Sequence, residues 1–269
     1  MTRVSNINNH IPDLPSKPAI NPLHARLLLY GSSGSGRSTF ASKFPSVYFD
    51  LSGTAQYLDI RRYPIEIPQG WRPGGKRRLS LWSWIVEGVE SCIRDRPAET
   101  LVIDTLDRAF EICFESVCES HGVSEPQENM RKMRQIYGSI NREFMTFLSR
   151  LSLYPGGVII IAGEECVHRT ASGTIVDSDD PDRVSSRWEP SFKAKSATKH
   201  KLRSKLEEIC GIICRAHAMG GTPSLAFGDP GSLTKDRTGL LPVASIPMNY
   251  SAFCEPFAKA YKKPEADGQ

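Results

Sequence analysis

The sequence predicts an α/β fold in which a mostly parallel β-sheet is covered by helices on both faces. Short apolar runs, typical of buried strands, alternate along the chain with segments whose apolar residues recur at helical spacing. Such an alternation builds a parallel sheet between two layers of helices. In addition, a loop rich in glycine and serine joins the first apolar run to the start of a helix, as in proteins that bind phosphate groups.

Five apolar runs are candidate strands, and they span residues 26–30, 47–50, 101–104, 158–162 and 209–215. Apolar residues at helical spacing predict helices over residues 38–43, 80–94, 106–121, 139–153 and 250–261. The region 224–241 has the character of a hairpin. From residue 163 to residue 205 the regular pattern ceases, and so long an irregular segment inside a compact domain is usually functional or mobile.

These patterns divide the chain into one large domain with two short ends. Residues 1–22 hold four prolines and predict a flexible N-terminal arm, the domain spans 23–262, and 263–269 form a tail. No stretch approaches the roughly 18 continuous apolar residues of a membrane span, and the N-terminus lacks the apolar segment of a secretory signal. We therefore expect a cytoplasmic protein without a membrane partner.

The cysteines and the charges limit the classes of partner. Seven cysteines lie inside apolar runs rather than in the short paired spacings of metal sites, which predicts buried, reduced thiols. The formal net charge of +4 is too small to indicate a nucleic-acid partner by itself. One stretch concentrates positive charge without any acid, at Lys193, Lys195, Lys199, Lys201, Arg203 and Lys205. Taken alone, this cluster is better explained by a solvated helix face.

The loop after the first apolar run carries the most specific motif. Residues 26–40 read RLLLYGSSGSGRSTF and match the phosphate-loop pattern G-x-x-x-x-G-K-[ST], except that Arg37 stands where the pattern has lysine. Glycines allow successive N–H groups to turn toward phosphate oxygens, and the helix that follows adds its positive end. The residues predicted to hold a nucleotide are Gly31, Ser32, Ser33, Gly34, Ser35, Gly36, Arg37, Ser38 and Thr39.

Three side chains in and near the loop are candidates for metal and phosphate chemistry. Ser38 is expected to place its hydroxyl on Mg²⁺, and Thr39 to reach an inner phosphate. Asp104, in LVIDT, ends an apolar strand, from which a carboxylate can hold a water on the same ion. Arg37 keeps the positive charge of lysine but spreads it over a longer planar fork, so it is not an equivalent replacement.

In the order and spacing of its segments, the chain resembles the RecA-like ATPases of phages known as phage nucleotide-binding proteins, which include the Sak-type single-strand annealing recombinases. The resemblance covers residues 25–260 and rests on the loop and on VYFDLSGTAQYLD, SWIVEGVESCIRDRPAETLVIDTLDRAFEIC, YGSINREFMTFLSRL, VIIIAGEE and KDRTGLLPVASIPMNYSAF. It implies a RecA-like P-loop NTPase core that binds ATP and Mg²⁺ between subunits of a homo-oligomeric ring or filament. It also implies that the protein handles single-stranded DNA in recombination or repair.

Three positions depart from the family pattern. Besides Arg37, Ser52 stands where the family commonly has a glutamate that orients the attacking water, and Gly163 stands where a polar sensor residue ends a strand. A serine does not act as a carboxylate base, and a glycine has no side chain to sense with. Slow or absent hydrolysis is therefore expected, although Glu164 and Glu165 are near enough in sequence to compensate.

The resemblance also assigns two cationic regions. In KDRTG, Lys235 and Arg237 alternate on one side of an extended segment, and in related proteins such a pair reaches the nucleotide of the neighbouring subunit. Arg237 is thus a candidate arginine finger, although a basic hairpin tip in water explains the pattern equally well. The segment 163–205 corresponds to a mobile DNA-binding loop, in which the six basic residues follow phosphates while Trp188 and Phe192 stack on bases.

Three hypotheses of function follow. The first is an ATP-binding, oligomeric protein of DNA recombination with impaired hydrolysis, so that Arg37, Asp104 and Arg237 are catalytic only if ATP is hydrolysed at all. The second is a non-catalytic, nucleotide-gated adaptor, which the three departures favour. The third is a small-molecule kinase of the phosphate-loop class. It is disfavoured because no arginine-rich lid is evident, although the stretch near Arg61 and Arg62 leaves it open.

Overall fold

The computed structural model describes residues 21–74, 79–177, 180, 182–191, 196–219, 221–242 and 244–261. The expected N-terminal arm, apart from its last two residues, and the tail 263–269 lie outside this part of the chain. Within it, no helix combines the length and the apolar character that crossing a membrane requires.

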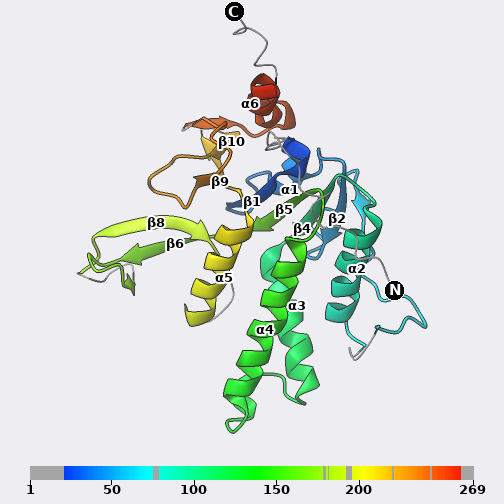
Figure 1. The fold of residues 1–269 in the computed structure, drawn as a ribbon. Coiled ribbons are helices and arrows are strands. Elements are labelled where there is room, and N and C mark those ends of the chain that lie inside the picture. The colour runs from blue at the N-terminus through cyan, green and yellow to red at the C-terminus, as the bar shows by residue number, and fades with distance from the viewer. Residues whose placement is uncertain are drawn as a thin grey trace, which may run out of the picture.

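A nine-stranded, mostly parallel sheet forms the centre of the molecule (Figure 1). Its order is β12-β10-β9-β1-β5-β4-β2-β3, with β11 paired to β9. The strands from β9 to β3 run parallel, whereas β10, β11 and β12 are added in antiparallel fashion. Their bounds are β1 Arg26–Gly31, β2 Ser46–Asp50, β3 Arg61–Arg62, β4 Thr100–Asp104, β5 Gly157–Ala162, β9 Ile212–Met219, β10 Thr222–Ala226, β11 Lys235–Asp236 and β12 Ser245–Pro247.

Helices cover both faces of this sheet. Those on one face are α2 Leu81–Asp95, α3 Leu106–Ser120, α4 Met133–Leu151 and α5 Ser196–Ile209, and those on the other are α1 Arg37–Ala41 and α6 Tyr250–Tyr261. Short 3-10 turns lie at Pro22–His24 and Pro126–Glu128.

The central strands β1, β4 and β5 are mostly apolar because both of their faces are buried. In β1, Leu28 and Tyr30 belong to the core under α2 to α5, whereas Leu27 and Leu29 belong to the core under α1 and α6. The same division by alternate residues holds along β4 and β5. The predicted fold class, an α/β fold with a mostly parallel sheet, helices on both faces and a C-terminal helix, is confirmed.

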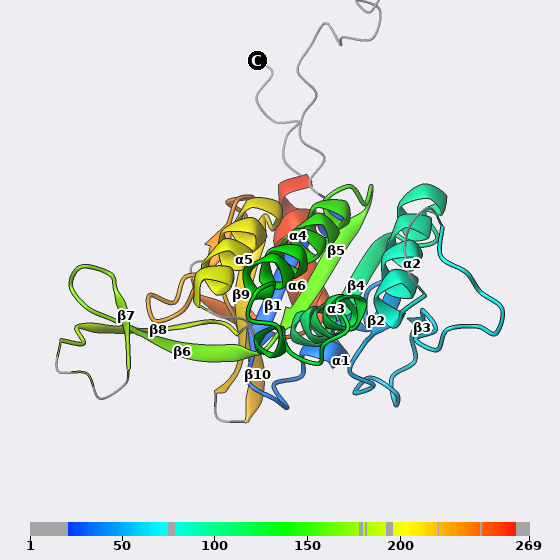
Figure 2. The ribbon, with the colours of Figure 1, turned by 90° about the horizontal axis from the view of Figure 1, so that it is seen from below.

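The segment expected to be irregular is instead largely regular. Strands β6 Glu164–Arg169, β7 Ile175–Val176 and β8 Ser185–Pro190 form a separate antiparallel sheet that projects from the body (Figure 2), and α5 follows. These strands carry mostly polar side chains, so backbone pairing forms them without the apolar periodicity that identifies the central strands. For the same reason the hydropathy pattern did not reveal them.

Three further boundaries differ from expectation. The last parallel strand starts at Ile212 rather than 209, because α5 continues to Ile209 and packs Leu202 and Leu206 into the core. Helix α4 begins at Met133, before the expected 139. Finally, 224–241 is not a simple hairpin: β10 pairs with β9 and β12, and β11 pairs with β9.

Candidate functional site

The glycine and serine loop connects β1 to α1 at the carboxyl edge of the parallel sheet. Gly34 has φ of 78° and Gly36 has φ of 88°, both in the left-handed region that only glycine adopts without strain. Because Gly36 turns the chain directly into α1, the N–H groups of the first helical turn lack intrahelical acceptors. The loop therefore has the backbone form that the phosphate-loop motif predicts.

Gly31 fixes the loop against the neighbouring strand. A Cβ atom at Gly31 would lie 2.3 Å from the carbonyl oxygen of Ala216 in β9, which is closer than any real contact of that kind. The hydroxyl of Ser35 is buried in the same loop and has no partner among the described residues. The loop is therefore packed closely against β9, and a buried hydroxyl lies inside it.

Two elements that are distant in sequence meet beneath the loop. Ser38 Oγ donates to Oδ2 of Asp104, the last residue of β4, at 2.6 Å. The same oxygen accepts a second hydrogen bond, of 2.5 Å, from the hydroxyl of Tyr48 in β2. The predicted pair of metal-site residues, Ser38 and Asp104, is therefore side by side, together with a tyrosine that the sequence did not single out.

Asp104 is an acid in a buried position. Its side chain is fully buried, and its Oδ1 has no hydrogen-bond partner among the described residues. Burial raises the pKa of Asp104, although the hydrogen bonds from Ser38 and Tyr48 oppose this shift. A serine hydroxyl next to a buried carboxylate with a free oxygen is a donor set that fits Mg²⁺, a hard cation that binds oxygen ligands and retains waters.

The side chain of Arg37 lies at the end of the sheet, where Nη1 donates to the carbonyl oxygen of Ala162, the last residue of β5. Burial lowers the pKa of Arg37, whereas the nearby carboxylates of Asp104, Glu164 and Asp107 favour its charged form. The guanidinium is thus surrounded by acids and bonded to the sheet. A lysine carries its charge on a single nitrogen. It lacks the planar guanidinium group, so it is less suited to the hydrogen bond with the Ala162 carbonyl oxygen.

The two other departures from the family pattern leave no catalytic group at their positions. Ser52 is exposed, and its hydroxyl forms a hydrogen bond with the hydroxyl of Thr54. At Gly163, a Cβ atom would lie 2.5 Å from Ser191 Oγ, and the N–H of Gly163 donates to Asp107 Oδ2 at 3.0 Å. The return of the chain after β8 therefore crowds the place where a sensor side chain would project.

The two glutamates considered as replacements are held in ion pairs. Glu164 accepts from Arg215 Nε at 2.7 Å, and Glu165 pairs with Lys199 Nζ at 2.7 Å. Glu164 remains electrostatically close to Arg37, whereas Glu165 connects β6 to α5. Both carboxylates are therefore engaged by cations instead of facing an attacking water.

The six basic residues assigned to DNA are divided by the structure. Lys193 and Lys195 lie outside the described residues. Besides Lys199, Arg203 is buried and pairs with Glu189, and Lys205 pairs with Glu208 at 2.8 Å. Lys201 is exposed on α5. The basic residues of the described part of this segment therefore do not form a set of free cations on an irregular loop. They lie on helix α5, which buries one of its faces and exposes the other.

The candidate arginine finger, Arg237, lies near the amino ends of the parallel strands, whereas the phosphate loop of the same chain lies at their carboxyl ends. Lys235, at the start of β11, pairs with Ile213 near the beginning of β9, whereas Gly31 pairs with Ala216 further along β9. Lys235 Nζ and the Arg237 guanidinium donate to the carbonyl oxygens of Glu207 and Glu208 at the C-terminal end of α5. Within one chain, Arg237 is thus a helix cap.

Two residues of the site escaped the sequence analysis. Tyr48 lies in the apolar run VYFD, and its one polar atom gave no periodic signal. Asp107 lies in the first turn of α3 and accepts the hydrogen bond from Gly163. Its position in the first helical turn, directly after the strand that ends at Asp104, was a signal that could have been used.

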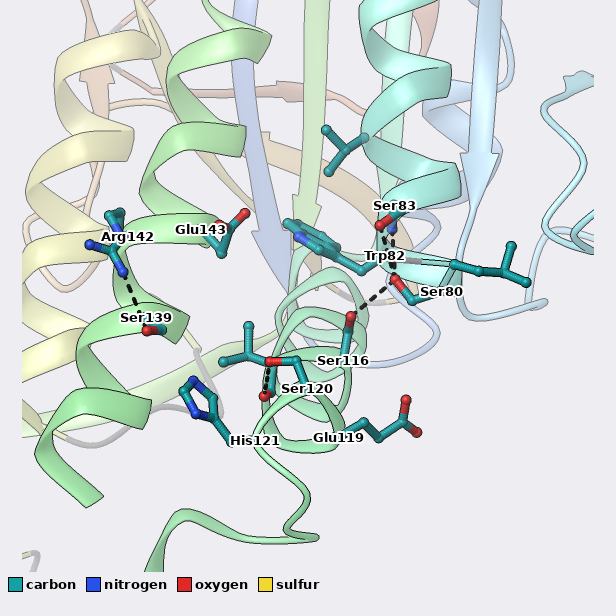
Figure 3. Close-up of a pocket in the computed structure, with 13 residues that line it drawn as sticks. Ser80, Trp82, Ser83, Ser116, Glu119, Ser120, His121, Ser139, Arg142 and Glu143 are labelled. Carbon is teal, nitrogen blue, oxygen red and sulfur yellow. Dashed lines mark hydrogen bonds between the residues drawn. The ribbon is translucent and has the colours of Figure 1, made fainter. Parts of the chain in front are cut away.

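A separate cavity of about 630 Å³ lies between α2, α3 and α4, away from the phosphate loop (Figure 3). Hydroxyls from the three helices line it, at Ser80, Ser83, Ser116, Ser120 and Ser139. Several of these hydroxyls bond to one another, as Ser116 does to Ser80 at 3.0 Å. Its lining includes no residue of the predicted nucleotide or metal site, so the site is defined by the motif geometry and not by the hollow in the surface.

The match to a known protein family agrees with this geometry. A family model described as an AAA domain matches residues 23–238. Among solved structures, the chain is similar to a KaiC-like protein of the hyperthermophilic archaeon Pyrococcus horikoshii OT3, with 11% sequence identity and a TM-score of 0.32. That similarity covers 84% of this chain and 89% of the archaeal one. No curated protein matches the chain.

Proposed function

The chain belongs to the AAA domain family, and from this premise we propose that it binds ATP with Mg²⁺, hydrolyses it slowly, and acts on single-stranded DNA in recombination or repair of the phage type. The observation that carries the nucleotide part is the hydrogen bond between Ser38 of the phosphate loop and Asp104 of β4. Together with the two left-handed glycines of the loop, it supplies a phosphate cradle and a metal site in one place.

In this proposal, different residues bind the phosphates, hold the metal ion and supply positive charge. The loop N–H groups bind the phosphates, and Ser38 and Asp104 hold Mg²⁺, which supplies charge neutralisation at the phosphoryl oxygens. Arg37 adds positive charge from the side of β5. Ser52 carries no carboxylate and Glu164 is paired with Arg215, so neither position supplies a free carboxylate to orient water, which supports slow hydrolysis.

Assembly into a ring or filament is part of the proposal. Arg237 caps α5 at the far edge of the sheet, so an arginine-finger role requires a second copy of the chain. The protein would then act in the cytoplasm, or in the host cytoplasm if a phage encodes it, and all seven cysteines are free thiols, in keeping with a reducing compartment.

The DNA part of the proposal is supported by the projecting sheet and α5. Trp188 is partly exposed on β8 with the guanidinium of Arg215 at 4.4 Å from its ring centroid, and Lys201 is exposed on α5. Aromatic faces and free cations are the groups that hold a single strand. Lys193 and Lys195 remain predicted contacts, whereas Arg203 is better explained as a structural residue.

A second candidate function is a nucleotide-gated adaptor that binds ATP or ADP without turnover. The observation that favours it is the set of closed ion pairs around the β5 edge, namely Glu164 with Arg215 and Glu165 with Lys199. A small-molecule kinase is less well supported. Arg61 donates to the carbonyl of Pro97 at 2.7 Å and Arg62 lies 3.6 Å from Asp50, so both arginines have structural partners instead of forming a lid.

One pair of assays separates these functions. ATP turnover is measured with and without a single-stranded oligonucleotide, and binding of a labelled strand is followed by fluorescence anisotropy across a salt series. A DNA-acting protein gives a log–log salt slope of about −0.7 for each phosphate neutralised, and replacing Lys193, Lys195 and Lys201 by alanine flattens it by roughly two units. Lys259→Ala, on the distant α6, is the control and leaves the slope unchanged.

The outcomes are distinct. No strand binding at low salt, with ATP binding intact, supports the adaptor instead of the DNA-acting protein. Transfer of phosphate to a small acceptor in preference to water supports the kinase.

A further inference from the structure

Tyr48 lies in the middle of β2, and its side chain is completely buried. Its ring belongs to the core under α1 and α6, with Phe40 and Ala55 among its members. Its hydroxyl nevertheless reaches the carboxylate of Asp104 on the adjacent strand, at 2.5 Å from Oδ2. A rigid aromatic side chain therefore delivers one polar atom from the core to the edge of the site.

The hydrogen bonds on Asp104 are distributed unevenly. Oδ2 accepts from both Tyr48 and Ser38, whereas Oδ1 is buried and has no partner among the described residues. A half-turn of the carboxylate would exchange the two oxygens. The hydroxyl of Ser38 is required at the metal when Mg²⁺ is bound, but the hydroxyl of Tyr48 has no such second role. Tyr48 alone is thus free to keep the carboxylate in one orientation.

We propose that Tyr48 is a positioning residue of the metal site, which holds Asp104 by Oδ2 so that Oδ1 is presented to the waters of a bound Mg²⁺. The inference rests on the proposed nucleotide and metal site and adds to it a residue outside both motifs. Tyr48 acts through Asp104 and does not itself touch the metal or the nucleotide.

The chemistry of the hydroxyl suits this role. Burial is the largest cause that raises the pKa of Tyr48, and the negative charge of Asp104 raises it further. The phenol hydroxyl is a hydrogen-bond donor, and its acceptor here is the carboxylate of Asp104. A phenylalanine would fill the same space in the core, and the neighbouring Phe49 shows that β2 accepts one. A hydroxyl at this position is explained by its acceptor, because a buried hydroxyl without one destabilises the fold.

The test compares the benefit of Mg²⁺ for nucleotide affinity in three proteins. A fluorescent ATP analogue is titrated into the parent, Tyr48→Phe and Tyr30→Phe, each with Mg²⁺ and with EDTA. Tyr30 is the matched control, because it is equally buried, lies in β1 of the same sheet, and donates its hydroxyl to the carbonyl of Trp188 at 3.1 Å instead of to Asp104. Circular dichroism verifies that the variants fold.

In Tyr48→Phe, the ratio of the Kd in EDTA to the Kd in Mg²⁺ is expected to fall about tenfold, the size of effect expected for one hydrogen bond to a charged group. The Kd in EDTA stays within about twofold of the parent value, because the backbone cradle is intact. Tyr30→Phe keeps the parent ratio. A merely structural role of Tyr48 would weaken both affinities together or neither.

Three results overturn the inference, and they are distinguishable. A parent that gains affinity from Mg²⁺ while Tyr48→Phe keeps the same gain overturns the role of Tyr48 alone. Equal losses in Mg²⁺ and in EDTA do the same. A parent that binds no nucleotide in either condition overturns the proposed function and this inference with it.

A measurement on the intact site keeps the test decisive if Tyr48→Phe does not fold. The ultraviolet difference spectrum of tyrosine is recorded when Mg²⁺ is added to the ADP complex of the parent and of Tyr30→Phe. A perturbation that persists in Tyr30→Phe supports a buried phenol coupled to the metal through Asp104, and a flat spectrum in both overturns it.

Discussion

Ser38 and Asp104 are 66 residues apart in the chain, yet the hydroxyl of one donates to the carboxylate of the other at 2.6 Å. The contact arises because β1 and β4 run in the same direction on either side of β5, so that the chain leaves both strands at the same edge of the sheet. Ser38 is presented by the loop that follows β1, and Asp104 is the last residue of β4.

Gly36→Val is expected to abolish the stabilisation of the fold by ATP. Gly36 has φ of 88°, which a β-branched residue does not adopt without strain, and a Cβ atom there already contacts Met248 at 3.7 Å. The measurement is the shift in melting temperature caused by ATP, taken against each variant's own baseline.

Gly138→Ala serves as the control for that experiment. Gly138 is exposed within α4 and has open space around its Cβ position, so alanine should stabilise the helix by about 0.5–1 kcal/mol and leave the ATP shift unchanged. An ATP shift of parental size in Gly36→Val would remove the phosphate-loop assignment.

Asp104→Asn is expected to stabilise the fold at neutral pH while removing the Mg²⁺-dependent part of nucleotide binding. Burial raises the pKa of Asp104, so the folded state binds this proton more tightly than the unfolded state. The stability contribution is therefore present below the unfolded pKa, about 4, and is lost as pH rises through the raised folded pKa.

The melting temperature of Asp104→Asn should accordingly exceed that of the parent by roughly 2–4 °C at neutral pH, the shift expected for 1 kcal/mol in a protein of this size. The two curves should converge in acid. Asp95→Asn is the control, because Asp95 is exposed on α2 and its pKa is lowered by Ser91 and Arg94. Parallel pH profiles for parent and Asp104→Asn would contradict the prediction.

The double variant Arg37→Lys, Ser52→Glu is expected to hydrolyse ATP faster than the parent. Arg37→Lys removes the hydrogen bond to the Ala162 carbonyl and directs a compact positive charge at the phosphates. Ser52→Glu places a carboxylate on the exposed loop after β2. A gain of about 100-fold would match the usual contribution of a general base.

Phosphate release at saturating ATP measures this gain. Arg37→Lys, Ser52→Gln is the control, since it restores the side-chain length without the charge. A parent that already turns over at about 1–100 per second, as many phosphoryl-transfer enzymes do, would show that the three departures are compensated.

Arg203→Ala is expected to act on stability and not primarily on DNA. Arg203 is buried against Glu189, which is itself almost completely buried and also pairs with Arg169, at 3.1 Å. Removing one partner of a buried pair costs roughly 3 kcal/mol, which lowers the melting temperature by on the order of 10 °C.

Lys201→Ala, two residues away on the exposed face of α5, should change the stability by no more than about 0.5 kcal/mol. It should still weaken the binding of a single strand. Thermal melts of both variants, followed by anisotropy at one low salt concentration, provide the comparison. Arg203→Ala with parental stability and lost DNA binding would restore the original assignment of Arg203 to the DNA surface.

Much of the site was predictable because its chemistry is local in sequence. The turn at Gly34 and Gly36, the hydroxyl of Ser38 and the acid that ends an apolar strand at Asp104 each have a short-range signature, and the structure brings them together. The hydrogen bond from the Arg37 side chain to the Ala162 carbonyl has no such short-range signature. The crowding at Gly163 depends on Ser191, which comes close only because β8 pairs with β6.

The parallel core, its two helical layers and the phosphate loop could be predicted from the order of residues, because doubly buried strands must be apolar and a glycine-rich turn must precede the helix. Which polar groups are free to act depends on contacts between distant elements. The tertiary structure encloses Arg203 with Glu189, turns Arg237 onto the end of α5, and places the hydroxyl of Tyr48 on Asp104. A charge or hydroxyl finds its partner across elements that are distant in the chain, and the order of residues records the group but not the partner.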